Sequence, residues 1–424
     1  MTRRSCWRPR APVSDGGGAK PDVTITGMGM VTSGGIGVKQ SWEAVLRGEG
    51  TATTDPALEG LDVTMSCRAE DFDGKEQLGR RARKLDRFVQ LTLVAAKEAI
   101  EDAGLDPESW DGARIGVVIG CGMGGAPTWE QEHSVLLERG HDRVSPHLIP
   151  RMIPNMAAGH VAMEFDAHGP NFCTATACAS GATAIGSALD LLRLDRCDLV
   201  IAGGTESGIT PLSIAGFANM TALSGRVDDP AAASRPFDSD RDGFVAGEAA
   251  GVVILERARD ADARAVRRYA DVAGYGASAD GHHVTAPHPE GAGGEGALRA
   301  ALADADLSAS DVDHVNAHGT STPLNDLSES RMISRVMPHG PSVTSTKGVT
   351  GHALGGAGAI EAIFSGLTIH HNTVPPTANL ENQDPEIEID VVGGAPRETD
   401  VDVVISDSFG FGGQNAVLAL TSPR

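Results

Sequence analysis

Short apolar runs that end in glycine alternate with helical patterns along this chain. Residues 23–29 (VTITGMG) and residues 270–276 (ADVAGYG) each predict a strand that stops at a Gly-x-Gly turn. A helix is predicted after each of these strands, over residues 85–103 and residues 296–305, where apolar positions recur at helical spacing. Strands that alternate with helices indicate an α/β architecture.

The order of the predicted elements recurs in the second part of the chain. In each half a strand leads into a helix of small residues, at residues 180–189 and residues 355–363, and a strand of buried type follows. Small side chains let neighbouring layers approach closely, so we expect these two helices to be buried on every side. The repeated order predicts an internal duplication, with halves at residues 21–265 and residues 266–424.

The first twenty residues do not follow this pattern. Residues 1–20 contain four arginines and a glycine triplet, and no apolar period is present. An Arg3-Arg4 pair occurs, but no apolar run follows it, so a secretion signal is not indicated. The segment is predicted to be a disordered extension.

The charge balance excludes some classes of protein. The chain has 35 basic and 57 acidic residues, a net charge of −22, which disfavours binding to nucleic acid. No apolar run reaches the ~18 residues that a membrane span requires. The six cysteines contain no CxxC pair and are expected to be reduced thiols of a cytoplasmic protein.

Cys178 is the first candidate for a reactive side chain. Residues 174–181 (TATACASG) place it where a strand is predicted to give way to a helix. The dipole and free N–H groups of a helix N-terminus stabilise an anion, so a thiolate would be accessible there, and the N–H of the same residue can face an oxyanion. A free cysteine is also commonly a small buried apolar side chain, and the residues alone leave both interpretations open.

Two histidines are expected in the place that matches Cys178. His318 and His352 each follow a predicted strand, and α/β folds bind ligands at the carboxyl ends of their strands. Lys347 and Glu361 flank His352 and could hold the imidazoles neutral or oriented, although a purely structural ion pair is the equal alternative. His283 is a lesser candidate, and the other histidines are treated as structural.

A glycine-rich segment follows the strand predicted at residues 402–406. Residues 408–413 (SFGFGG) place two aromatic rings among small residues, which predicts a loop able to move a ring into and out of a pocket. An ordinary glycine turn with two core aromatics is the alternative.

Five motifs together resemble the β-ketoacyl-acyl-carrier-protein synthases, in their elongating, type II branch. The motifs are residues 176–180 (TACAS), 235–244 (RPFDSDRDGF), 318–322 (HGTST), 347–352 (KGVTGH) and 409–413 (FGFGG). The resemblance covers roughly residues 22 to 420, in the family's order. It implies a thiolase-like fold, with duplicated βαβαβ halves in a five-layered α/β/α/β/α arrangement, and usually a dimer.

The resemblance also implies a reaction. Cys178 would take an acyl chain as a thioester. His318 and His352, supported by Lys347 and Glu361, would assist loss of CO₂ from malonyl-carrier protein. The backbone N–H groups of Cys178 and Phe411 would form the oxyanion hole. No metal and no redox cofactor is implied, and substrates would arrive on the phosphopantetheine of an acyl-carrier protein.

Further positions follow from the resemblance alone. The threonines that would hydrogen-bond the phosphopantetheine arm are Thr285, Thr320 and Thr322. The residues that would gate or limit the acyl pocket are Phe409, Phe411 and Met123, and the adaptable methionine favours medium or longer chains. The basic residues that would dock an acidic carrier protein, against the negative charge of the whole chain, are Arg80, Arg83 and Lys84.

Three positions depart from the family's pattern. Asp407 stands where an asparagine is usual, and an extra carboxylate near a thiolate would be unfavourable unless it is paired. Residues 247–251 read GEAAG in place of the common GEGAG, which predicts a packing change. Thr221 occupies a place where some members have a basic docking residue.

Two other roles stay open for a chain of this kind. It could be the ketosynthase chain of a type II polyketide or polyene synthase, paired as a heterodimer with a chain-length factor instead of as a homodimer. It could also be a non-catalytic chain-length factor, but such chains lose the nucleophile. A thiolase is disfavoured because residues 405–415 contain no second cysteine.

Overall fold

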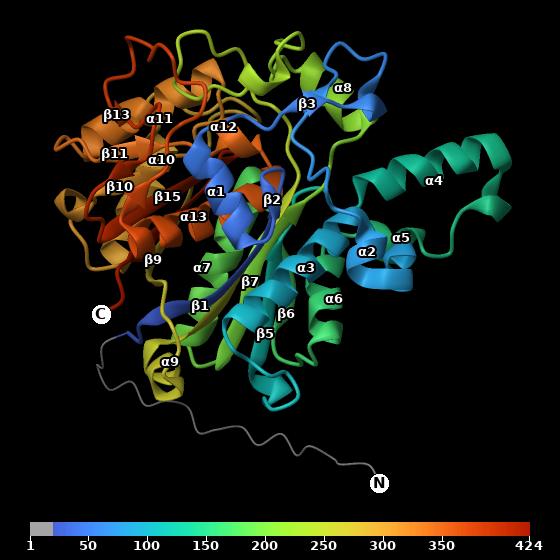
Figure 1. The fold of residues 1–424 in the computed structure, drawn as a ribbon, viewed down its shortest axis with the longest axis horizontal. Coiled ribbons are helices and arrows are strands. Elements are labelled where there is room, and N and C mark those ends of the chain that lie inside the picture. The colour runs from blue at the N-terminus through green and yellow to red at the C-terminus, as the bar shows by residue number, and fades with distance from the viewer. Residues whose placement is uncertain (1–19) are drawn as a thin grey trace.

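The structure, a computed structural model, describes residues 20–424, so the predicted extension at residues 1–20 lies outside it except for Lys20. One twelve-stranded mixed sheet runs through the molecule (Figure 1). In spatial order its strands are β13 (Asp390–Val391), β11 (Ser342–Thr344), β10 (His314–Asn316), β15 (Val403–Gly410), β16 (Gln414–Thr421), β9 (Ala270–Ala279), β1 (Val23–Thr32), β8 (Ala249–Arg257), β7 (Leu199–Glu206), β5 (Ile115–Gly120) and β6 (Asn171–Thr174), and β2 (Gly35–Ile36) pairs with β1.

The strand directions repeat across the middle of this sheet. Strands β6, β5 and β7 are parallel, and β8 and β1 follow in antiparallel pairing. Strands β11, β10 and β15 are likewise parallel, and β16 and β9 follow in antiparallel pairing. The halves join where β1 pairs with β9, at Thr24 with Asp271 and Ile25 with Ala270. The predicted duplication is confirmed, while the division at residue 265, between α9 (Ala258–Arg264) and β9, stays a prediction.

Helices cover the sheet halves in layers. Helices α7 (Ser180–Arg193) and α13 (Ala357–His371) lie between the two halves, in one apolar core with residues of β5 and β15. Helices α3 (Arg87–Asp102) and α6 (Met156–Glu164) cover the outer face of the first half. Helices α10 (Ala292–Asp304) and α11 (Pro323–Val336) cover the outer face of the second. The α/β class and the five layers are therefore as predicted.

The central helices pack closely because of their small residues. A Cβ atom added to Gly358 of α13 would lie 2.8 Å from the backbone nitrogen of Ala182 on α7. Every residue of α13 from Ala357 to Ile369 is buried, as expected. The same expectation is wrong for α7, where Thr183 and Ser187 are half-buried and Asp190 is exposed, because one face of this helix reaches the edge of the layer.

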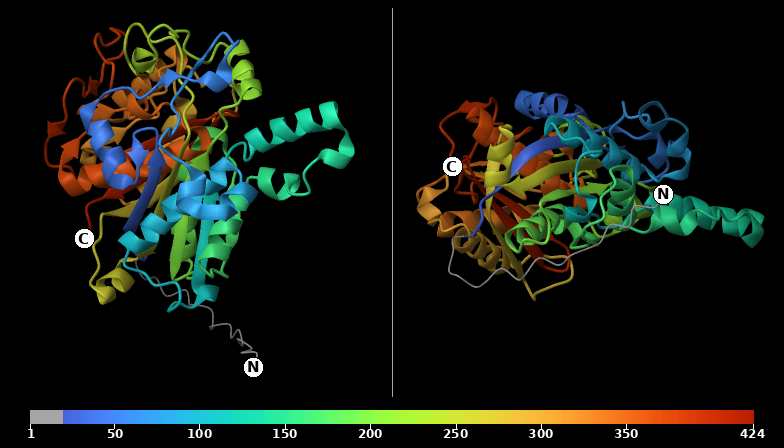
Figure 2. Two further views of the ribbon diagram at one scale, coloured as in Figure 1. Left: turned by 45° about the vertical axis from the view of Figure 1, so that its right-hand side comes forward. Right: turned by 90° about the horizontal axis from the view of Figure 1, so that it is seen from below.

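The predicted strands and helices at both Gly-x-Gly turns are present as β1, α3, β9 and α10. Helices α4 (Ala126–Arg139) and α5 (Leu148–Met152) project from the body as an arm (Figure 2). The remaining elements are α1 (Val38–Arg47), α2 (Gly74–Leu78), α8 (Pro211–Asn219), α12 (Lys347–Thr350), and the short pairs β3 (Thr53–Thr54) with β4 (Met65–Ser66) and β12 (Thr373–Val374) with β14 (Arg397–Glu398). No helix within residues 20–424 is long and apolar enough to span a membrane.

Candidate active site

Cys178 lies in a tight turn rather than at the end of a strand. Strand β6 ends at Thr174, and a single 3₁₀ turn, Ala177–Ala179, leads into α7. Ala177 has a φ of 50°, in the left-handed region that residues with a side chain rarely adopt. Such strain is concentrated at functional sites, and here it sharpens the turn that carries the thiol.

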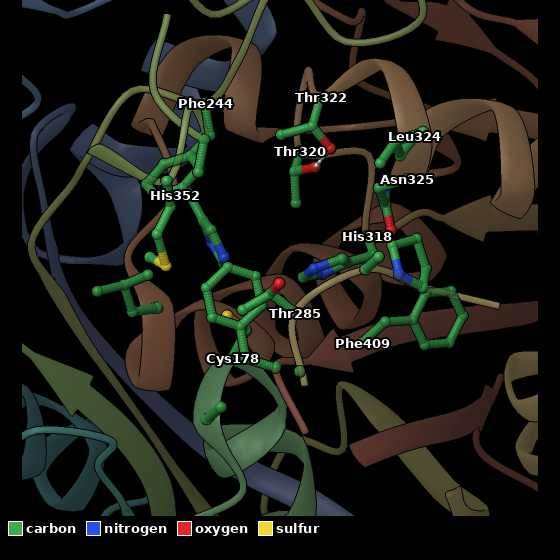
Figure 3. Close-up of a pocket in the computed structure, with 18 of the residues that line it drawn as sticks. Cys178, Phe244, Thr285, His318, Thr320, Thr322, Leu324, Asn325, His352 and Phe409 are labelled. Atoms are coloured by element: carbon green, nitrogen blue, oxygen red, sulfur yellow. Dashed lines mark hydrogen bonds between the residues drawn. The ribbon is translucent and has the colours of Figure 1, made fainter. Parts of the chain in front are cut away.

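The thiol faces a cavity of about 540 Å³, which gathers residues of both halves of the chain. His318 and His352 also line it, and their rings turn toward the space beside Cys178 (Figure 3). The centroids of the two imidazoles are 5.3 Å apart, and the ring planes cross at 84°. The structure therefore brings together the three side chains that the sequence singled out first.

The electrostatics of Cys178 differ from the expectation of an accessible thiolate. Burial raises the pKa of this thiol to about 12, because it penalises the charged form. The charge of Lys347 and the backbone N–H groups of Phe411 and Cys178 lower the pKa but do not outweigh burial. The resting group is a thiol, and the two N–H groups assigned to the oxyanion hole both act on its sulfur.

Backbone hydrogen bonds fix the positions of the two histidines. The N–H groups of His318 and Gly319 donate to the two carboxylate oxygens of Glu329, at 2.7 and 2.8 Å. The N–H of His352 donates to the carbonyl of Val245 at 2.8 Å. His318 lies two residues beyond β10, as predicted, but α12 separates His352 from its strand β11.

Both imidazoles are neutral in this environment. Burial, and then the charge of Lys347, lower the pKa of His318 and of His352 well below the ordinary value. The Nδ1 atom of each ring is buried and has no hydrogen-bond partner among the described residues. A neutral imidazole keeps one N–H donor and one acceptor nitrogen, so each ring can donate to a substrate oxygen.

Lys347 and Glu361 form an ion pair inside the protein. The ammonium group contacts one carboxylate oxygen, and both side chains are almost fully buried. Burial raises the pKa of Glu361, and Lys347 opposes this effect. The charge of Lys347 also lowers the pKa of Cys178 and of both histidines.

The surroundings of Asp407 disfavour a negative charge on its side chain. Its side chain is fully buried, and neither carboxylate oxygen has a hydrogen-bond partner within residues 20–424. Burial raises its pKa well above the ordinary value, the carboxylates of Glu329 and Glu361 raise it further, and only Lys347 opposes them. These surroundings therefore favour the protonated, neutral form of the carboxyl group.

The predicted loop around the two phenylalanines is shorter than expected. Strand β15 continues through Phe409 to Gly410, and only Phe411, Gly412 and Gly413 form the turn before β16. Both glycines have positive φ, 86° and 69°, a conformation that glycine adopts without steric cost. Phe409 therefore has a strand's hydrogen bonds, and the turn begins only at Phe411.

The other predicted pocket residues also reach the cavity. Its lining includes Met123, Phe409, Phe411, Thr285, Thr320 and Thr322. The hydroxyl groups of Thr320 and Thr322 are 2.8 Å apart. His283 is absent from the lining; its Nδ1 accepts hydrogen bonds from the N–H groups of Thr285 and Ala286, at 3.1 and 3.0 Å, so it shapes the loop that carries Thr285.

The basic residues at 80–84 lie away from the cavity lining. Arg80, Arg83 and Lys84 are exposed on a 3₁₀ helix, Gly79–Lys84. Arg81 is paired with Glu164, whereas the other three have no carboxylate partner in the described part of the chain. Thr221 lines the cavity and adds no charge.

Two buried carboxylates at the site were missed in the sequence. Glu329 holds the backbone of His318, and Glu206 accepts from the N–H groups of Gly122 and Met123. A signal existed for Glu206, because it ends the apolar strand LVIAGGTE, where an acidic residue must be buried. Glu329 lies on a helix with an ordinary mixture of polar residues and has no comparable signal.

Comparison with known families matches almost the whole chain. Residues 20–261 match the family described as "Beta-ketoacyl synthase, N-terminal domain", and residues 269–381 match "Beta-ketoacyl synthase, C-terminal domain".

Curated relatives have similar lengths. The chain is 45% identical over 408 residues to 3-oxoacyl-[acyl-carrier-protein] synthase 2 of Synechocystis sp., a match that covers 94% of this chain and 98% of that protein. It is 44% identical over 402 residues to the protein of the same name from Staphylococcus aureus, with coverage of 93% and 97%.

Solved structures share the fold. A ketosynthase/chain length factor described as that of ishigamide and a beta-ketoacyl synthase from Burkholderia phymatum each superpose with a TM-score of 0.89 at 32% identity. Both alignments cover 95% of this chain and all of the other.

Proposed function

The chain belongs to the β-ketoacyl synthase family of condensing acyltransferases, and from this premise we propose how its own residues condense an acyl group with malonyl-acyl-carrier protein. The product is 3-oxoacyl-acyl-carrier protein. The observation that supports the proposal is that one cavity is lined by Cys178 of one half and by His318 and His352 of the other.

In the first half-reaction the acyl chain moves to Cys178. The sulfur attacks the carbonyl carbon of an acyl thioester, and the bond to the carrier's sulfur breaks. The thiol proton leaves with the carrier thiol, by way of a neutral imidazole that can accept it. The N–H groups of Cys178 and Phe411, which act on the sulfur in the resting site, then hydrogen-bond the acyl oxygen.

In the second half-reaction the malonyl group loses CO₂. Neutral His318 and His352 donate N–H hydrogen bonds to its thioester oxygen, where negative charge develops as the carboxylate departs. The carbanion attacks the acyl carbon on Cys178, the carbon–sulfur bond breaks, and the sulfur takes up a proton. Decarboxylation drives the condensation, so the reaction requires neither a metal nor a redox cofactor.

Lys347 and Glu361 keep this site in the required charge state. A protonated imidazole has no free nitrogen to accept the thiol proton, and Lys347 disfavours that form by lowering the pKa of both histidines. Glu361 neutralises the lysine, so the buried ammonium has a partner.

The test uses acyl- and malonyl-carrier protein with the whole chain. Cys178→Ala should abolish both the mass increase of the acylated enzyme and the condensation product. Cys197→Ala is the matched control, because this cysteine is also buried but does not line the cavity, and it should retain both. Condensation by the Cys178→Ala protein would refute the assignment.

Substrates are proposed to enter on the phosphopantetheine arm of an acyl-carrier protein. Thr285, Thr320 and Thr322 line the cavity, and their hydroxyl groups can hydrogen-bond the amides of such an arm. The exposed cations Arg80, Arg83 and Lys84 form a local basic patch on a chain of net charge −22, suited to an acidic carrier. The acyl chain itself is proposed to lie beside Met123, Phe409 and Phe411.

A homodimer is proposed, with the arm of α4 and α5 as part of the contact. Trp129, Leu137 and Ile149 of this arm are exposed, and β6, the last strand of the sheet, carries the exposed Phe172. A heterodimer with a chain-length factor is the second candidate, because ketosynthase/chain length factor structures share this fold. Native mass spectrometry of the chain expressed alone separates them: a stable homodimer supports the first, and a monomer supports the second.

The cytoplasm is the proposed location. The five cysteines within residues 20–424 are all free thiols, which suits a reducing compartment.

A further inference from the structure

No step of the proposed reaction uses the motif at residues 235–244 (RPFDSDRDGF), but this segment encloses Ser321 of the other half. The N–H of Arg235 donates to the side-chain oxygen of Ser321 at 3.0 Å. The N–H of Gly243 donates to the backbone carbonyl of the same serine at 3.1 Å. The two ends of one segment therefore hold a single residue, and that residue lies between Thr320 and Thr322.

Ser321 has a conformation that needs such support. Its φ is 70°, in the left-handed region that residues with a side chain rarely adopt, and it is fully buried. A residue keeps such a conformation only where the surrounding structure fixes it. The two hydrogen bonds from residues 235–243 do so, because they restrain both the backbone and the side chain of Ser321.

The left-handed turn at Ser321 brings the hydroxyl groups of its two neighbours together. The oxygens of Thr320 and Thr322 are 2.8 Å apart, and both side chains line the cavity (Figure 3). Thr322 is the N-cap residue of α11, yet its side chain makes no capping hydrogen bond. A threonine at an N-cap usually accepts such a bond, so the hydroxyl of Thr322 is directed to Thr320 and the cavity instead of to the helix.

This segment is itself anchored to the rest of the protein. Asp238 accepts hydrogen bonds from the side chain of Arg235 and from the two backbone N–H groups of residues 381–382, each at 2.9 Å. Arg241 is buried and donates to the carbonyl of Pro323, the first residue of α11, at 3.3 Å. The segment is therefore a fixed support for the loop that carries the two threonines.

We propose that Ser321 is a positioning residue for the phosphopantetheine arm: held by residues 235–243, it fixes the hydroxyl groups of Thr320 and Thr322 at the spacing that binds the arm. This inference rests on the proposed function, which places the arm at these threonines. Two hydroxyl groups that share one hydrogen bond keep one O–H donor and free lone pairs, and these can bind an amide of the arm.

The test follows acylation of Cys178 in the whole chain with two acyl donors. One is an acyl-pantetheine thioester, which carries the amides of the arm, and the other is the S-ethyl thioester of the same acid, which has none. Ser321→Ala removes the acceptor for the N–H of Arg235. It should raise the half-saturating concentration of acyl-pantetheine about three- to tenfold, the usual effect of one lost hydrogen bond, and change the maximal rate less than about twofold. The rate with the S-ethyl thioester should stay unchanged.

Ser321→Gly is measured beside Ser321→Ala. Glycine lacks the same acceptor but adopts a positive φ without strain, so this variant keeps the turn even if the alanine variant fails to fold. It should show the same selective rise with acyl-pantetheine. Ser41→Ala is the matched control, because Ser41 is also buried and accepts a hydrogen bond, from Thr32 at 2.9 Å, but lies on α1 and does not line the cavity. It should leave both donors unaffected.

The threonines show whether the effect passes through them. Thr320→Val combined with Thr322→Val removes both hydroxyl groups and should raise the half-saturating concentration of acyl-pantetheine. Adding Ser321→Gly to this pair should raise it no further, because residues that act through one contact do not have additive effects.

Each unfavourable outcome points to one error. Normal saturation by acyl-pantetheine in both Ser321 variants, an equal loss with both donors, or a further rise on the threonine background would overturn the role of Ser321. A threonine double variant that saturates normally would overturn the arm site on which this role rests. An unchanged protein whose Cys178 takes an acyl group from neither donor nor from acyl-carrier protein would instead overturn the proposed function.

Discussion

Asp407 offers a sharp test of the electrostatics, because its buried carboxyl group has no hydrogen-bond donor to either oxygen within the described residues. Replacing it by asparagine keeps the shape of the side chain and removes the ionisable group. We therefore expect Asp407→Asn to stabilise the folded protein near neutral pH.

The sign of the pH dependence follows from the direction of the shift. Burial, then Glu329 and Glu361, raise the pKa of Asp407 in the folded state. At a pH below the ordinary carboxyl pKa of about 4, both states hold the proton, so the titration of this group costs no stability. As the pH rises, the unfolded chain releases its proton and the folded protein keeps it, so stability is lost.

The magnitude comes from the linkage between pKa and stability. Each unit by which the pKa in the folded state exceeds that in the unfolded chain costs about 1.4 kcal/mol once the pH is above both, so we expect Asp407→Asn to raise the free energy of unfolding by more than about 1 kcal/mol at pH 8. The assay is guanidinium unfolding at a series of pH values from 5 to 8. The gain over the unchanged protein should be smallest at pH 5 and should grow with pH.

Asp402→Asn is the control for this series, because Asp402 is exposed just before β15 and should show no such trend. A gain from Asp407→Asn that stays constant with pH would contradict the assignment of a raised pKa. A loss of stability at pH 8 would show that the ionised carboxylate has a partner, and would refute the reasoning.

Three further outcomes are expected. Lys347→Met combined with Glu361→Gln removes the buried ion pair and with it the positive charge of Lys347, so the pKa of both imidazoles should rise. The acidic limb of the pH profile of kcat should then move to higher pH, and an unmoved limb would show that the pair is only structural. Reversing the charges of Arg83 and Lys84 should raise KM for acyl-carrier-protein substrates about fivefold and leave kcat unchanged, and unaltered kinetics would exclude docking there. Gly358→Ala should lower the free energy of unfolding by about 1–3 kcal/mol, since the new Cβ would lie 2.8 Å from a backbone nitrogen of α7. An unchanged free energy of unfolding would show that the central layers can separate to admit the methyl group.

Two of these tests have matched controls in the same chain. Lys39→Glu reverses one charge on the exposed face of α1, half the change of the double variant, and should not alter KM for the carrier protein. Gly216→Ala, which meets no neighbouring atom, should not lower the free energy of unfolding.

Local patterns were enough to predict the architecture and to single out three side chains that meet in the cavity. The apolar run of β1, which is buried on both faces, and the helical period of α3, which is buried on one, depend on residues close together in the chain. The same order of patterns in the second half predicted the duplication. Cys178, His318 and His352 stood out because each follows a strand, and strands of a parallel sheet bring their carboxyl ends to one edge.

Packing between distant segments decided the properties of those residues. The thiol of Cys178 has a raised pKa because segments from the whole chain bury it, and no short motif reports burial of that kind. Phe409 belongs to a strand because β16 pairs with it, although its glycine neighbours favour a loop. The hydrogen bonds from Arg235 and Gly243 to Ser321 likewise arise only when the two halves meet. Sequence periodicity records which face of an element is apolar, whereas distances and pKa values depend on atoms that only the folded chain brings together.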